Sequence, residues 1–222
     1  MLLYRLLTIV LSPLILGHIL YLSIKNKQGR YFWQRLGFRC SHLPTDSLWF
    51  HCASVGEVNT LLPLLNNIHM QDEQLRFIIT TNTVTGGKIV EQQGLDYLYH
   101  HYLPFDWVHG INRFLSTIRP RSLYIMETEI WPNLFDLCAD NHIPLYLINA
   151  RLSSKTTSAS SWIKSLLSSS LSNVRTIYTR SENDTDAYIL LGADKEKIET
   201  TGNLKLTTIL EDEHTIKNDN VT

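Results

Sequence analysis

Apolar runs of strand length recur along most of the chain, and segments whose apolar residues follow helical spacing separate them. The runs occupy residues 48–55, 75–81, 97–102, 122–126, 144–149 and 176–179. After the first run the chain turns at Gly56, and Val58, Leu61 and Leu65 then keep the spacing of one helix face. Strands that alternate with helices are typical of an α/β fold, so the pattern predicts a Rossmann-like parallel sheet with helices on both faces.

The second predicted strand leads into a polar, glycine-rich stretch at residues 82–87, before a helix expected at residues 88–93. The stretch lacks P-loop spacing, because Asn82 stands where the first glycine should be and Ile89 where the hydroxyl should be. Its backbone N–H groups could still bind a sugar or a phosphate. The alternative is a plain turn without a ligand.

An almost wholly apolar run precedes the predicted sheet. Residues 6–24 are interrupted only mildly, for example by Pro13 and His18, and roughly 20 apolar residues suffice to span a bilayer. Basic residues mostly follow the run, so the positive-inside rule predicts an amino-terminal membrane helix with the rest of the chain in the cytoplasm. A helix lying in the membrane interface is the alternative, which Pro13 and His18 favour.

The sequence divides into four parts on this interpretation. We expect a membrane anchor at 1–24, a basic juxtamembrane segment at 25–47, a Rossmann-like domain at 48–210 and a polar tail at 211–222. The basic segment could contact anionic lipid, or it could be a solvated connector. The formal net charge of −1 gives no case for nucleic-acid binding. The three cysteines are widely spaced and form neither a metal-binding pattern nor a disulfide framework.

Acidic residues follow two of the predicted strands. Glu57 comes just after the first strand, and Glu127 and Glu129 follow the fourth, while Lys205 comes after the last predicted helix. Ligands of open α/β sheets gather at the carboxyl ends of the strands. A carboxylate there suits general-base work on a hydroxyl, and a cation suits charge developing on a leaving group. Each residue could instead be a helix cap or part of a surface ion pair.

Six motifs that the strands and turns place in order point to one family. They occupy residues 54–58, 80–86, 102–106, 126–133, 148–153 and 202–205. Together they resemble the amino-terminal half of the 3-deoxy-D-manno-octulosonic acid (Kdo) transferases of Gram-negative bacteria. The resemblance implies the amino-terminal domain of a GT-B glycosyltransferase. It also implies transfer of Kdo from CMP-Kdo to the lipid A precursor in lipopolysaccharide biosynthesis, with inversion and with neither metal nor cofactor.

The resemblance also assigns roles to individual residues. Glu57 matches the family's proposed general base, and Glu127 and Lys205 match positions thought to stabilise the transition state. Glu129 lies in the same motif as Glu127 and is the second choice for its role. An acid beside an oxocarbenium-like centre would favour its positive character.

The family's chains continue through a second domain that carries the CMP-Kdo site, whereas this sequence stops at Thr222. We therefore expect the acceptor-binding half with the base, held by a single anchor at the cytoplasmic face of the inner membrane. A truncated, non-catalytic, membrane-anchored module that binds the lipid A precursor is the alternative. An unrelated Rossmann-type domain is disfavoured, because no Gly-x-Gly-x-x-Gly fingerprint follows any predicted strand.

Overall fold

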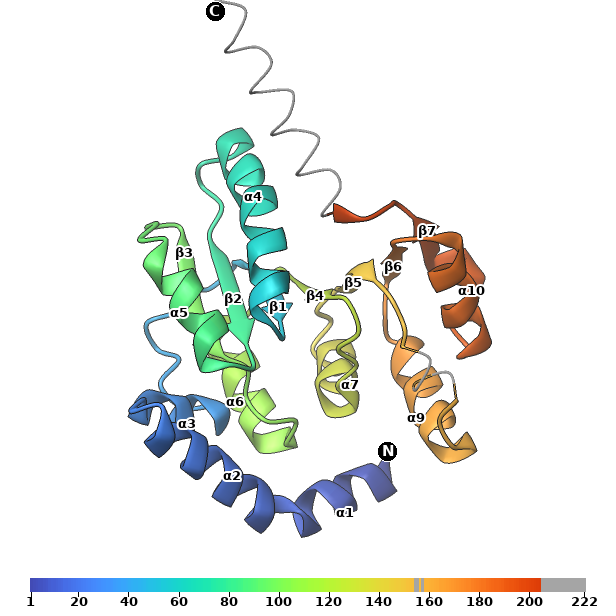
Figure 1. Ribbon diagram of the computed structural model, residues 1–222, viewed down its shortest axis with the longest axis horizontal. Helices are drawn as coiled ribbons and strands as arrows, with labels where there is room; N and C mark the ends of the chain where they lie inside the picture. The colour runs from blue at the N-terminus through green and yellow to red at the C-terminus, as the bar shows by residue number, and fades with distance from the viewer. Residues whose placement is uncertain (154–155, 157, 205–222) are drawn as a thin grey trace, which may run out of the picture.

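A single parallel sheet forms the centre of the molecule. The computed structural model describes residues 1–153, 156 and 158–204 (Figure 1). The described strands run in the order β3-β2-β1-β4-β5-β6-β7, and every neighbouring pair is parallel. Their bounds are β1 (Leu48–Cys52), β2 (Phe77–Thr81), β3 (Leu98–Tyr102), β4 (Ser122–Met126), β5 (Leu145–Ala150), β6 (Thr176–Thr179) and β7 (Ile198–Thr200).

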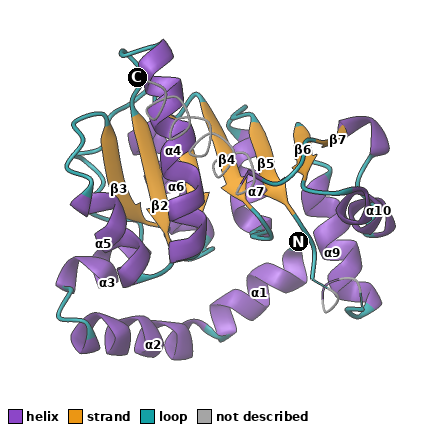
Figure 2. Cartoon of the chain, turned by 45° about the horizontal axis from the view of Figure 1, so that its top comes forward, coloured by secondary structure: helices purple, strands orange, loops and turns teal. Residues whose placement is uncertain are grey.

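Helices pack on both faces of this sheet (Figure 2). One face is buried against α4 (Val55–Gln71) and α5 (Val84–Gln92). The other is buried against α6 (Val108–Ile118), α7 (Pro132–Asp140), α9 (Ser161–Leu171) and α10 (Glu182–Leu190). Side chains alternate along the strands, so Phe50 and Cys52 belong to the first core while Trp49 belongs to the second. The predicted Rossmann-like parallel sheet is therefore confirmed.

Several element boundaries differ from the expectation. The first strand stops at Cys52 and α4 already begins at Val55. The glycine-rich stretch is not a free turn, because Thr83 caps α5 by accepting a hydrogen bond from the N–H of Gly86 and the helix starts at Val84. Among the described residues of the serine-rich stretch at 153–172, α9 covers Ser161–Leu171. β7 was not predicted, since its three residues are largely exposed and follow a short 3₁₀ turn at Lys195–Lys197.

The prediction of a single membrane-spanning helix is wrong. The apolar run forms two helices, α1 (Leu2–Val10) and α2 (Ser12–Lys25), which meet at an angle of 56°. Pro13 lies in the first turn of α2, where it has no N–H to bond back and its ring would clash with a continuing helix. No single helix in the described residues is long and apolar enough to cross a bilayer, although the bent pair together has that length and composition.

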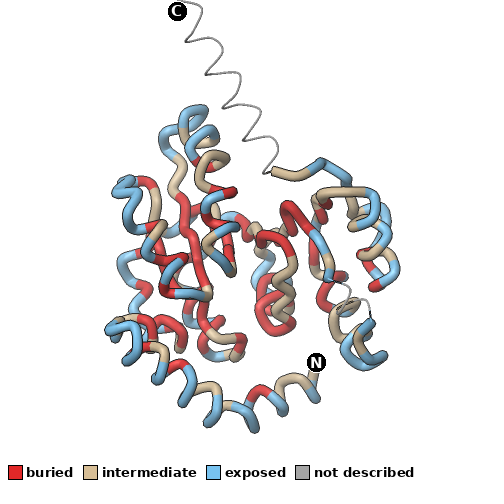
Figure 3. The backbone as a smooth tube through the Cα atoms, viewed as in Figure 1, coloured by how far each residue is buried: buried red, intermediate tan, exposed pale blue. Residues whose placement is uncertain are grey.

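The two helices pack against the sheet domain through a few polar and apolar contacts. The hydroxyl of Tyr4 donates to Asp106, and Ile19 is buried in a small cluster with Tyr31 and Tyr102. α3 (Gly29–Arg35) connects α2 to the sheet. Much of the outer surface of α1 and α2 is exposed (Figure 3). That surface is apolar, and its most exposed large residues are Leu2, Leu3, Leu6, Ile9, Val10, Leu14, Tyr21 and Ile24.

Candidate active site

The strand order places a topological switch point between β1 and β4. From β1 the chain continues through α4 to β2 on one side, and from β4 it continues through α7 to β5 on the other. Connections that diverge in this way open a crevice at the carboxyl ends of the two strands. Glu57 follows β1 and Glu127 follows β4, so the fold brings these two predicted site residues to the same crevice.

Glu57 is fixed at the start of α4 by a capping box. The Ser54 hydroxyl accepts from the Glu57 N–H at 3.3 Å and donates to Glu57 Oε1 at 2.8 Å. The N–H of Ala53 donates to Glu57 Oε2 at 2.8 Å. The helix-cap interpretation of Glu57 is therefore confirmed, and the same contacts hold its carboxylate in one orientation.

Burial raises the pKa of Glu57 above its ordinary value, since only 8% of the residue is exposed. The hydrogen bonds from Ser54 and Ala53 act against this change, and the nearby charge of Glu127 adds to it. A carboxylate with a raised pKa is a stronger base than a solvated one. The position therefore combines a fixed orientation with increased basicity.

Glu127 has a strained backbone and a strong ion pair. Its φ is 57°, in the left-handed region that residues other than glycine adopt uncommonly. The Nε of Arg151, just beyond the end of β5, donates to Glu127 Oε2 at 2.6 Å. The Tyr188 hydroxyl donates to the Glu127 carbonyl at 3.4 Å. Strain of this kind concentrates at functional sites, and here it falls on a buried acid whose charge acts on Glu57.

Glu129 lies in a polar group with Asn82 and His51, and the charge of His51 also acts on Glu57. The Asn82 amide donates to Glu129 Oε2 at 3.1 Å, and His51 Nε2 lies 3.9 Å from the same oxygen. Burial acts to raise the pKa of Glu129, but the interactions with His51, Trp131 and Asn82 outweigh it and hold the pKa below its usual value. His51 is fully buried, and its Nδ1 lies 3.0 Å from the Thr80 hydroxyl. Glu129 therefore stays ionised, next to the buried imidazole of His51.

Lys205 lies outside the described residues. The residue before it, Leu204, donates its N–H to the side chain of Asn149 at 3.3 Å. Asn149 lies at the end of β5 and also has a left-handed φ of 50°. The motif at residues 202–204 therefore reaches the carboxyl end of the sheet, beside the strand that Glu127 follows.

The sequence reasoning missed three partners of the acids, namely Arg151, His51 and Asn82. A usable signal existed for two of them. Asn82 comes directly after a predicted strand and Arg151 two residues after another, at the edge where Glu57 and Glu127 were sought. His51 lies within an apolar run, so the residue pattern showed no sign of its contacts. They follow from the pairing of β1 with β2, which places His51 opposite Thr80.

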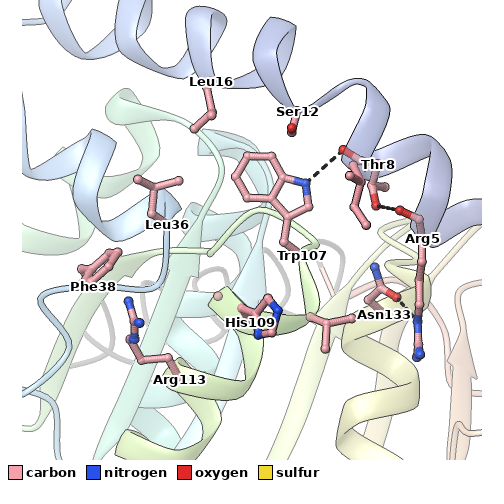
Figure 4. Close-up of a pocket in the computed structure, with 13 residues that line it drawn as sticks. Arg5, Thr8, Ser12, Leu16, Leu36, Phe38, Trp107, His109, Arg113 and Asn133 are labelled. Atoms are coloured by element: carbon pink, nitrogen blue, oxygen red, sulfur yellow. Dashed lines mark hydrogen bonds between the residues drawn. The ribbon is translucent and has the colours of Figure 1, made fainter.

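A large apolar cavity lies apart from these acids, between the amino-terminal helices and the sheet domain. It measures about 670 Å³ and is lined by α1, α2, the residues after α3 and the start of α6. In Figure 4 the indole of Trp107 points toward α1, where it donates to the carbonyl of Thr8 at 3.2 Å. Arg5 of α1 donates to the side chain of Asn133 at 3.0 Å on another wall.

Solved structures resemble this chain in fold alone. The UDP-GlcNAc 2-epimerase from Neisseria meningitidis matches with a TM-score of 0.55 at 11% identity, over 77% of this chain and 50% of that one. The putative UDP-N-acetylglucosamine 2-epimerase from Listeria monocytogenes matches with a TM-score of 0.52 at 13% identity, over 72% of this chain and 45% of that one. Both support the Rossmann-like architecture.

Sequence relatives are much closer. The 3-deoxy-D-manno-octulosonic acid transferase of Haemophilus influenzae is 35% identical over 95% of this chain and 50% of its own length. A probable mitochondrial 3-deoxy-D-manno-octulosonic acid transferase of Arabidopsis thaliana is 35% identical over 69% of this chain and 35% of its own length. The chain thus spans half or less of the length of these relatives. The family model of 3-deoxy-D-manno-octulosonic-acid transferase (kdotransferase) matches residues 30–208. The resemblance seen in the motifs is confirmed, and the chain belongs to the Kdo transferase family.

Proposed function

We propose that a polypeptide containing this chain transfers Kdo from CMP-Kdo to the lipid A precursor in lipopolysaccharide biosynthesis. This chain would supply the acceptor-binding half of a GT-B enzyme, and the region that the longer relatives add would bind the donor. Family membership supports the reaction class. The observation that carries the residue assignment is the buried, oriented carboxylate of Glu57 at the switch point.

In this proposal Glu57 takes the proton from an acceptor hydroxyl as its oxygen attacks the anomeric carbon of Kdo. The new glycosidic C–O bond forms on the face opposite the breaking bond to CMP, which leaves with its electron pair, and the configuration inverts. Glu127, held by Arg151, adds negative charge close to an oxocarbenium-like centre. Glu129 remains the second choice for that electrostatic role, and Lys205 would offset charge on the leaving phosphate.

A second candidate is a non-catalytic module that only binds the lipid A precursor. One observation favours it: both carboxylate oxygens of Glu57 accept hydrogen bonds within the capping box, as a purely structural cap would. A base needs only one free lone pair, and each carboxylate oxygen has two, so the capping contacts leave room for an acceptor hydroxyl.

We further propose association with the cytoplasmic face of the inner membrane. The exposed apolar residues of α1 and α2 support contact with lipid, and the basic residues after α2 are suited to anionic headgroups. A bent pair of helices lying in the interface accounts for the exposed surface and for the contacts that hold α1 to the domain.

The test is a chimera in which residues 1–208 replace the matching half of the Haemophilus influenzae relative. Transfer of Kdo from CMP-Kdo to the lipid A precursor is measured beside the intact relative and its isolated carboxyl half. The proposal predicts transfer by the chimera and none by the isolated half. A chimera that folds cooperatively and binds acceptor but transfers no Kdo would instead favour the non-catalytic module.

A further inference from the structure

A second cavity lies between α2 and the carboxyl ends of β2, β3 and β4. It measures about 470 Å³. One wall comes from α2 and is mostly apolar, with Ile15, Ile19 and Leu22 beside His18. The opposite wall includes Arg35 and Asn82, and Asn82 is the residue that donates to Glu129. The cavity therefore joins the exposed apolar helix to the polar edge of the sheet where the candidate site lies.

Arg35 is a buried cation that has no ion-pair partner in the part of the chain that the structure describes. Only 7% of the residue is exposed, and burial lowers its pKa. Its Nη1 donates to the Leu103 carbonyl at 2.6 Å and to the Asn82 side chain at 2.9 Å, both neutral groups. None of the ion pairs among the described residues includes Arg35, and its buried Nε has no hydrogen-bond partner there. Buried charges are costly unless they are paired, so this guanidinium is suited to an anion that enters the cavity.

Trp131 lines the same cavity, next to Glu129. Its indole Nε1 is buried beside the Glu129 carboxylate, and the interaction with Trp131 helps to lower the pKa of Glu129. The charge of Glu129 also acts on Arg35 without forming a contact. An incoming anion would therefore have to bind on the Arg35 side, away from Glu129. A buried guanidinium whose Nε has no partner among the described residues, beside an apolar wall, matches a ligand with an anionic head and an aliphatic tail.

We propose that this cavity binds an acylated lipid carrying a phosphate group, with the phosphate at Arg35 and an acyl chain along α2. The identification of that lipid as the glycosyl acceptor rests on the proposed function, whereas the binding itself does not. The site would hold the acceptor beside the switch point and so limit which hydroxyl reaches Glu57. Arg35 is a binding residue in this account and takes no part in the chemistry.

Binding is tested with the full chain and three probes below their micelle concentrations: dodecyl phosphate, dodecyl maltoside and inorganic phosphate. Titration calorimetry should give at least tenfold tighter binding for dodecyl phosphate than for either of the others. Equal affinity for the two dodecyl probes would contradict an anion site. Tight binding of inorganic phosphate alone would contradict the role of the apolar wall.

Two variants locate the site. Arg35→Gln should lower the affinity for dodecyl phosphate to that of dodecyl maltoside. Arg35 also connects α3 to the Leu103 carbonyl, so the melting temperature of Arg35→Gln is measured to check that it folds. Ile15→Trp provides a second variant, which fills the cavity and leaves the guanidinium unchanged. Ile15→Trp should weaken dodecyl phosphate binding at least tenfold, while Leu20→Trp, on the exposed side of the same helix, should not. Unchanged binding in folded Ile15→Trp would overturn the proposal.

The same variants separate this inference from the proposed function. In the chimera, Ile15→Trp should raise the KM for the lipid acceptor at least tenfold with little change in kcat. If dodecyl phosphate binding is lost but that KM is unchanged, the lipid site exists and is not an acceptor subsite. If the chimera without this substitution transfers no Kdo, the proposed function fails while the binding result stands.

Discussion

The Nε of Arg151 lies 2.6 Å from Glu127 Oε2, so a half-exposed arginine just beyond the end of β5 forms an ion pair with a buried acid just beyond the end of β4. This pair matters because the charge of Glu127 raises the pKa of Glu57. An arginine beside Glu127 lets two carboxylates share one crevice without forcing one of them to hold a proton. The arginine therefore tunes the base through its neighbour, which makes it a positioning residue.

Loss of that arginine should change how the enzyme responds to pH. In the chimera, Arg151→Ala leaves Glu127 unpaired, which raises the pKa of the neighbouring Glu57. A base must be ionised to act, so the acid limb of the pH–rate profile should move upward by roughly one unit. Arg151→Lys keeps the charge and should largely restore the profile. A pH–rate profile of Arg151→Ala that overlays the unsubstituted one would contradict this role.

Membrane association should depend on the exposed residues of α1 and α2. Leu3, Val10 and Ile24 are 52%, 72% and 70% exposed, so their replacement by glutamine spares the core. Burial of one such side chain in lipid is worth about 1.5–3 kcal/mol, so the triple variant should lose at least about tenfold in partitioning onto anionic vesicles. Leu190→Gln on α10, at an equally exposed site, is the control. Equal sedimentation of the triple variant and the wild type with vesicles would show that these helices do not contact lipid.

Stability should fall with rising pH through Asp106. This buried carboxylate accepts hydrogen bonds from Tyr4 and from the N–H groups of Asn133 and Leu134, yet burial raises its pKa to about 6 from the ordinary 3.8. Between these values the folded state holds more protons than the unfolded state. The stabilisation that Asp106 provides is therefore complete below pH 3.8. The free energy of unfolding should drop by on the order of 3 kcal/mol as the pH rises to 6 and beyond.

The control for this prediction is Asp106→Asn, which cannot titrate at that position. Denaturant unfolding of both proteins is measured from pH 4 to pH 7. The difference in unfolding free energy between them should change across this range, with the wild type losing stability relative to the variant. Parallel curves would mean that Asp106 has an ordinary pKa in the folded protein.

Much of the sheet could be predicted from the sequence because central parallel strands are buried on both faces and so form short apolar runs. The strands beginning at Ser122 and Thr176 were placed correctly for this reason. β7 could not be placed, because it is a short edge strand with little buried surface. The prediction for the amino-terminal run was wrong for another reason. Its composition resembles that of one membrane-spanning helix, while the break before Pro13 depends on backbone geometry.

The site was only half visible in the sequence. The positions of Glu57 and Glu127 follow from the rule that ligands meet the carboxyl ends of strands, and the structure brings both to the switch point. Neither the left-handed backbone at Glu127 nor its pairing with Arg151 could be predicted from the residue pattern. The contact of Glu129 with Asn82 likewise requires the strand order, since 47 residues separate the two in the chain.

The most direct test of the central claim is the transfer rate of the Glu57→Gln chimera. Glutamine also completes a capping box, so it preserves the start of α4 while removing the basic oxygen. The account predicts a fall in rate by a factor on the order of 10²–10⁴, with acceptor binding and melting temperature retained. A structural cap would lose only about 0.3–1 kcal/mol of stability. A nearly normal rate with a small melting shift would contradict the account and make Glu127 or Glu129 the better candidate for the base.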